Sequence, residues 1–138
     1  MGSRSLGGAA PLRGGIRVGD GVLYGVMLAP LSKTLPILRY DQFVHIVGFG
    51  VATLVMYHLL RPLLRPGVRP GTALCIVVAM AGLGVGGLNE SIEFIATVLV
   101  PETGVGGYLN TALDLVADLV GAVLAVVIIR LGWLFPPP

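Results

Sequence analysis

The chain has 138 residues, enough for one small domain. Its mean hydropathy of +0.92 and its 12% charged residues exclude an ordinary soluble domain, in which about 25% of residues are charged. The net charge is only +2, and the basic residues stand at the ends of apolar segments rather than along one stripe, so no nucleic-acid partner is expected. The composition predicts an all-α polytopic protein of the lipid bilayer, a transmembrane helical bundle of three to four spans.

The first twenty residues are rich in glycine and arginine and contain no long apolar core, so we expect residues 1–20 to be flexible and not a signal peptide. Residues 21–135 are expected to form a single membrane-embedded helical domain. Within it, residues 21–38 are apolar but interrupted by two prolines and a lysine. A re-entrant or kinked helix fits this segment as well as a crossing does.

Three stronger spans follow. The first covers residues 40–64, and the basic turn 65–71 with two prolines and two glycines comes after it. The second is the apolar stretch 72–100, and the third occupies residues 109–134. Small residues recur in all three and predict close helix packing, because packing drives helix association in lipid, and we also expect homo-oligomers through the glycine faces. These residues are Gly48, Gly50, Ala79, Gly82, Gly86, Gly121, Ala122 and Ala125.

The arginines predict an orientation. Arg61, Arg65 and Arg69 follow the first span, whereas the loop 101–108 after the second span has no lysine or arginine. The positive-inside rule therefore places the first of these loops and the C-terminus in the cytoplasm. If residues 21–38 also cross, seven basic residues lie inside against two outside, which places four spans slightly ahead of three.

Six ionisable side chains lie within or beside the spans in three pairs with helical spacing. The pairs are Asp41 with His45, Glu90 with Glu93, and Asp114 with Asp118. A charge at mid-helix costs about 2.5–3.5 kcal/mol on the insertion scale, so such groups tend to face a bundle interior and to serve function. The predicted topology brings all three pairs into the outer leaflet. We therefore predict that the six residues are ligands or acid/base groups of one site.

Two asparagines extend this pattern. Asn89 stands four residues before Glu93, and Asn110 stands four residues before Asp114. That spacing lets each amide hydrogen-bond to the neighbouring carboxylate and fix its orientation.

Five carboxylates and one imidazole cannot all be ionised close together at low dielectric. Three solutions stay open: a bound divalent metal ion, shared protons as in a proton-coupled transporter, or neutral acids that hydrogen-bond between helices as structure alone. For the metal, the candidate ligands are His45, Glu93, Asp114 and Asp118, and oxygen donors with one histidine suit Zn²⁺, Mn²⁺, Fe²⁺ or Mg²⁺. The leading hypothesis is a cation-dependent site for an envelope or lipid-like ligand, enzyme or not. Carboxylates that converge on one point favour the metal, and carboxylates paired one-to-one favour structure.

The sequence around each of the three pairs resembles a motif of known membrane proteins. The run from Arg39 to His45 (RYDQFVH) resembles the Tyr-Asp-x-x-x-His entry into a helix of YjdF-like bacterial inner-membrane proteins, and Asn89-Glu90-x-x-Glu93 resembles their glutamate-containing helix. The element Asp114-x-x-x-Asp118-x-x-Gly121-Ala122 resembles their last motif and, more distantly, that of VanZ-like proteins, in which asparagine stands at the place of Asp118. The resemblance covers about residues 20–130. It implies a multi-pass protein of a bacterial or archaeal plasma membrane and implies no particular reaction.

Overall fold

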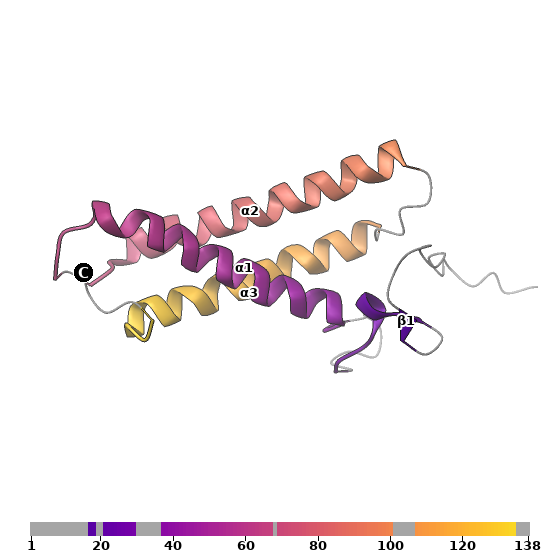
Figure 1. Ribbon diagram of the computed structural model, residues 1–138, viewed down its shortest axis with the longest axis horizontal. Coiled ribbons are helices and arrows are strands. Elements are labelled where there is room, and N and C mark those ends of the chain that lie inside the picture. The colour runs from indigo at the N-terminus through magenta and orange to yellow at the C-terminus, as the bar shows by residue number, and fades with distance from the viewer. Residues whose placement is uncertain (1–16, 19–20, 30–36, 68, 101–106, 135–138) are drawn as a thin grey trace, which may run out of the picture.

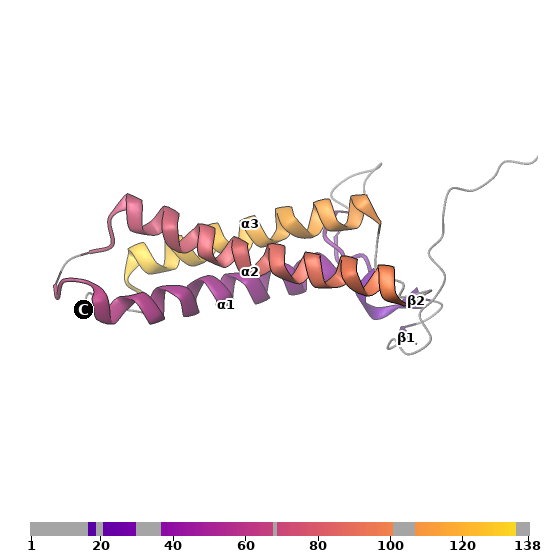
Figure 2. The same ribbon diagram turned by 90° about the horizontal axis from the view of Figure 1, so that it is seen from above.

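The computed structural model describes residues 17–18, 21–29, 37–67, 69–100 and 107–134. Most of the predicted flexible N-terminus therefore lies outside the described residues. Within the described chain, three long helices lie side by side, alternating in direction (Figures 1 and 2). They are α1 (Tyr40–Leu60), α2 (Thr72–Leu99) and α3 (Tyr108–Leu131), and the short 3₁₀ helix η2 (Arg61–Leu63) extends α1. Each long helix is long and apolar enough to cross a membrane, which confirms the all-α membrane bundle.

The chain doubles back before α1. Three short elements are described there: β1 (Arg17–Val18), β2 (Gly21–Val22), which pairs antiparallel with β1, and the 3₁₀ turn η1 (Leu23–Gly25). The backbone N–H of Leu28 then donates to the carbonyl oxygen of Leu38 at 2.9 Å, and Tyr40 N–H donates to Val26 at 2.8 Å. These bonds place Leu38 and Tyr40 beside Leu28 and Val26, which precede them in the chain. This region therefore adds no fourth crossing in the part of the chain that the structure describes. Residues 30–36 lie outside the described residues.

Glycines set the contact between α1 and α3, which is the most extensive helix contact in the described bundle. A Cβ atom at Gly121 would overlap the carbonyl oxygen of Ile46 and lie 2.9 Å from the backbone nitrogen of Gly50. The two backbones therefore touch, as small residues allow in lipid. Gly48 does not share this role, because nothing lies within 4 Å of where its Cβ would be.

The glycines of α2 accommodate polar side chains rather than another backbone. A Cβ atom at Gly82 would overlap the hydroxyl oxygen of Thr53 in α1, and one at Gly86 would overlap Oδ2 of Asp118 in α3. Thr53 and Asp118 are fully buried as a result. These two positions of α2 thus make room for the polar groups that the bundle encloses.

The far end of the bundle, where α1 ends and α2 begins, is apolar inside. Tyr57, Val78 and Ile129 form a buried cluster there, one residue from each helix. Large apolar side chains such as Leu59 and Met80 are exposed on the outside of the helices, as expected for surfaces that contact lipid.

Candidate functional site

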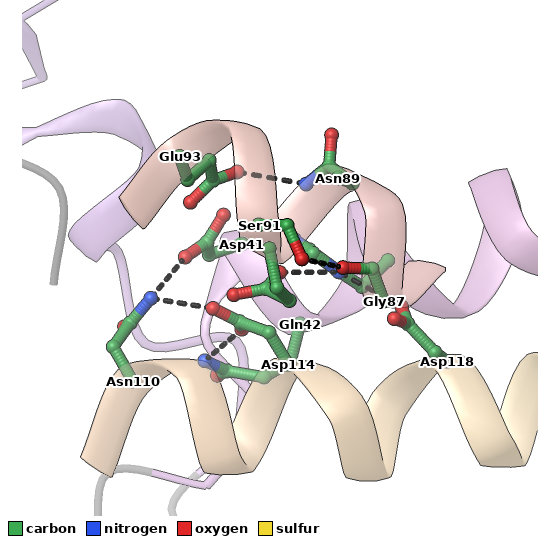
Figure 3. Close-up of polar contacts among 11 residues, drawn as sticks. Asp41, Gln42, Gly87, Asn89, Ser91, Glu93, Asn110, Asp114 and Asp118 are labelled. Carbon is green, nitrogen blue, oxygen red and sulfur yellow. Dashed lines mark hydrogen bonds and ion pairs between the residues drawn. The ribbon is translucent and has the colours of Figure 1, made fainter. Parts of the chain in front are cut away.

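Polar side chains from all three helices meet at the end of the bundle where α1 and α3 begin and α2 approaches its end (Figure 3). We call this group the polar cluster, and it contains Asp41, Gln42, His45, Asn89, Glu90, Glu93, Asn110, Asp114 and Asp118. All six ionisable residues predicted from the sequence are among them. Asp114 and Asp118 are 0% exposed, and His45 and Glu90 are each 6% exposed. The helix spacing and the predicted topology together therefore indicated which ionisable groups the fold brings together.

The shortest contact between two ionisable side chains of the cluster joins α1 to α3. His45 Nδ1 lies 2.8 Å from Asp118 Oδ1, and Glu90 Oε1 from α2 lies 3.9 Å from the same nitrogen. A carboxylate at this distance favours the tautomer with its proton on Nδ1, so that the lone pair stands on Nε2. Asp118 thus orients the imidazole and leaves one ring nitrogen available as a ligand.

Amide side chains hold the two aspartates nearest the helix starts. Gln42 Nε2 donates to Asp114 Oδ1 at 3.1 Å, and its own Oε1 accepts the backbone N–H of Arg39 at 2.8 Å, which fixes the orientation of the amide. Asn110 Nδ2 donates to Asp114 Oδ2 and, at 3.2 Å, to Asp41 Oδ2 (Figure 3). The predicted bond between Asn110 and Asp114 is confirmed. Asp114 therefore has a donor on each oxygen.

Sequence reasoning missed Gln42. Its side chain is 4% exposed and reaches Asp114 across 72 positions of sequence. A signal existed, because Gln42 stands three residues before His45 and therefore on the same helix face. An uncharged amide among apolar residues draws less notice than a charge, although its burial also requires a partner.

The α2 side of the cluster is less completely paired. Asn89 Nδ2 donates to Glu93 Oε1 at 2.8 Å, as the spacing predicted. Among the described residues, both carboxylate oxygens of the buried Glu90 lack a hydrogen-bond partner, as does Asp118 Oδ2. A buried carboxylate without a partner is costly, so Glu90 requires a proton or a positive charge beside it.

Two sets of three side chains in the described residues place possible ligand atoms within 4.8 Å of one another. The first set is Asp41, His45 and Asp114, and the second is His45, Glu90 and Glu93. Of the four ligands predicted from the sequence, His45 belongs to both sets, Asp114 to the first and Glu93 to the second. Asp118 belongs to neither and instead contacts His45. The geometry therefore divides the predicted ligands between two adjoining positions.

A groove adjoins the second set. Its volume is about 860 Å³, and its walls include Glu90, Glu93 and Phe94 from α2 and Tyr108, Thr111 and Leu115 from α3. We call it the α2–α3 groove. Phe94 is 68% exposed and Tyr108 is 91% exposed, so the groove opens to the outside of the bundle. The polar cluster thus has one side that is open to the outside of the bundle.

The family model described as "Predicted membrane protein (DUF2238)" matches residues 15–132. The chain belongs to this family. The matched range includes all three long helices and every residue of the polar cluster. No curated protein and no solved structure matches the chain. The family thus supports the membrane location, and the chemistry of the cluster has to be argued from its own geometry.

Proposed function

We propose that this protein binds a divalent cation between its membrane spans, at Asp41, His45 and Asp114, and that it binds a lipid-like envelope ligand in the α2–α3 groove on the other side of the polar cluster. One observation carries the proposal: three ligand atoms lie within 4.8 Å of one another, and two of the three side chains are buried. Two carboxylates and a neutral imidazole would balance the charge of a divalent ion and offer ligands suited to Zn²⁺, Mn²⁺ or Fe²⁺.

The neighbours of these three residues favour this position over the second set. Metal-bound side chains are commonly held by hydrogen bonds from outside the ligand set. Asp118 contacts His45 Nδ1, while Asn110 donates to both Asp41 and Asp114. The carboxylate of Glu90, in contrast, has no hydrogen-bond partner among the described residues. The first set is therefore the better-supported ligand group.

The structural alternative also has an observation in its favour. The contacts between His45 and Asp118 and between Gln42 and Asp114 join side chains directly across the α1–α3 interface. Such pairs hold membrane helices together without a metal. Metal analysis separates the two possibilities, because hydrogen bonds alone retain no ion.

The test is the metal content of the purified protein after equilibration with Zn²⁺ or Mn²⁺ and removal of free ions, measured by plasma mass spectrometry. We expect a stoichiometric ion in the wild type and loss of most of it in Asp114→Asn, which keeps the shape of the side chain but removes its charge. Glu93→Gln is the matched control and should retain the ion. Absence of metal from the wild type at every concentration, or its retention in Asp114→Asn, would reject the cation site.

Within the family, we propose that this protein is of the YjdF-like type. Its support is the resemblance of three motifs, which contain Tyr40 to His45, Asn89 to Glu93 and Asp114 to Ala122. All three motifs contribute to the polar cluster or to the glycine contact beside it.

A further inference from the structure

We propose that the α2–α3 groove binds the hydrocarbon chain of an amphiphile whose head group is a protonated amine, with Glu90 and Glu93 as the opposite charges. This names the chemical class of the lipid-like ligand and rests on that part of the proposed function. It uses two carboxylates that the cation position at Asp41, His45 and Asp114 does not require.

The position of the groove favours a ligand that enters it from the membrane. Its walls lie on α2 and α3, both of which are long and apolar enough to span the bilayer. Phe94 and Ile95 are more than half exposed at its edge, and Leu115 is 40% exposed. A volume of about 860 Å³ is in the range of ligand pockets, which are mostly apolar with a few placed polar groups. The occupant best suited to these walls has a hydrocarbon chain.

The charges of the groove select the head group. Glu90 and Glu93 line it, and no lysine or arginine of the described residues does. Glu90 is 94% buried, and neither of its carboxylate oxygens has a hydrogen-bond partner among the described residues. An ammonium group brings three N–H donors and a positive charge to such a carboxylate. A phosphate head group would instead meet two acidic side chains and, in the part of the chain that the structure describes, no basic wall residue.

Aromatic side chains in the same groove favour a cationic head group independently. Phe94 follows Glu90 by four residues, which places both on one face of α2, and Tyr108 lies on the α3 wall. The faces of aromatic rings attract ammonium groups, and carboxylates with nearby rings are a common means of recognising them.

The test compares amphiphiles that share one chain and differ in their head group. Purified protein in a neutral maltoside detergent is mixed with dodecylammonium, dodecanol or dodecyl phosphate, and also with methylammonium, a free amine without a chain. Native mass spectrometry then measures how much of each ligand is retained. We expect dodecylammonium to bind at least about tenfold more tightly than the other three. Equal retention of dodecyl phosphate or of methylammonium would overturn the proposal.

Two variants locate the binding in the groove. Leu115→Trp fills the groove from α3 without touching a carboxylate, and it should abolish dodecylammonium retention. Leu119→Trp, one turn further along α3, is the matched control and should bind as the wild type does, because Leu119 is half exposed and outside the groove. Glu90→Gln should weaken binding about tenfold. Unchanged binding in Leu115→Trp would overturn the proposal even if Glu90→Gln fails to fold.

The same samples separate this inference from the cation site. If metal is present and dodecylammonium does not bind, the groove proposal is wrong and the cation site stands. If dodecylammonium binds and metal is absent, the groove proposal is supported and the cation site fails.

Discussion

The two ends of the bundle are held together by different means. At one end, buried polar groups pair across the helices, as His45 and Asp118 do at 2.8 Å. At the other, Tyr57, Val78 and Ile129 form an apolar core. In lipid, apolar side chains gain little by contacting each other instead of acyl chains, so packing quality and polar pairs decide which helices associate. The polar end should therefore contribute more to the stability of the bundle, and the apolar end should tolerate more change.

The largest effect is expected from breaking the buried pair between α1 and α3. Asp118→Ala leaves His45 without its closest partner, in a site that is 6% exposed. Removing one member of a buried charged pair costs about 3–5 kcal/mol. Thermal unfolding in detergent, followed by circular dichroism, should show a large loss of stability.

The double variant tests the origin of that loss. Once His45 is also alanine, the added cost should be small, because the partner left behind is gone. If the effects of His45→Ala and Asp118→Ala simply add, the two residues are not coupled and the comparison of the two ends loses its main support.

The next effect concerns the glycine contact between the two ends. Gly121→Ala places a methyl group against the carbonyl oxygen of Ile46, which is backbone and can move only if the helix moves. Overpacking of this kind costs about 1–3 kcal/mol. Gly48→Ala, also in a membrane span but with nothing within 4 Å, should stay within about 0.5 kcal/mol of the wild type. Equal unfolding temperatures for the two variants would contradict the backbone contact.

Local spacing explains what the sequence could predict about the site. The bonds from Asn89 to Glu93 and from Asn110 to Asp114 are contacts between residues four apart on one helix, and helical periodicity alone determines them. The meeting of the three acidic pairs followed from hydropathy and chain reversal, because alternating helices bring the start of one span next to the end of the previous one. These features required no knowledge of how the helices face each other.

The partners between helices could not be predicted in the same way. The bond between Gln42 and Asp114 depends on the register of α1 on α3, which the touching backbones of Gly50 and Gly121 set. Helical spacing does not contain that register. It also gave no reason to separate Asp118, which contacts His45, from the residues that form the two possible ligand sets.

The segment before α1 was the least predictable part of the fold. Its apolar composition allowed a crossing, and the count of seven basic residues inside against two outside depended on that crossing. The hydrogen bonds of Leu28 with Leu38 and of Tyr40 with Val26 turn the chain back instead. The seven-to-two count therefore no longer applies, and the orientation depends on the contrast between the arginines that follow the first span and the loop 101–108, which has none. A cytoplasmic C-terminus stays a prediction, which labelling of single cysteines placed in the loop 65–71 of intact cells would test.

A moderate effect is expected from changing Gln42, one of the uncharged residues of the polar cluster. Gln42→Leu removes the donor to Asp114 Oδ1 but leaves the second donor, Asn110, in place. A hydrogen bond between membrane helices is worth about 0.6–2 kcal/mol, so stability should fall by about 1 kcal/mol. Gln42→Glu should cost more, because it adds another acid beside Asp114. If Gln42→Glu is as stable as the wild type, the amide is not needed as a donor, and the hydrogen-bond account of this end is wrong.

The smallest effects should come from the apolar end. Ile129→Val removes one methylene from a residue that is 2% exposed, and its cost should be about 0.5–1.5 kcal/mol, at the lower end if neighbouring side chains relax into the space. Arg130→Gln removes the donor of a 3.2 Å hydrogen bond to Thr72. Because this bond is exposed, water or lipid head groups replace it, and the free energy of unfolding should change by no more than about 0.5 kcal/mol. Both values come from the same unfolding measurement as Asp118→Ala. If either variant destabilises the protein as much as Asp118→Ala, the bundle is not anchored mainly at its polar end, because loss of a small contact at the apolar end would then matter as much as loss of a buried pair.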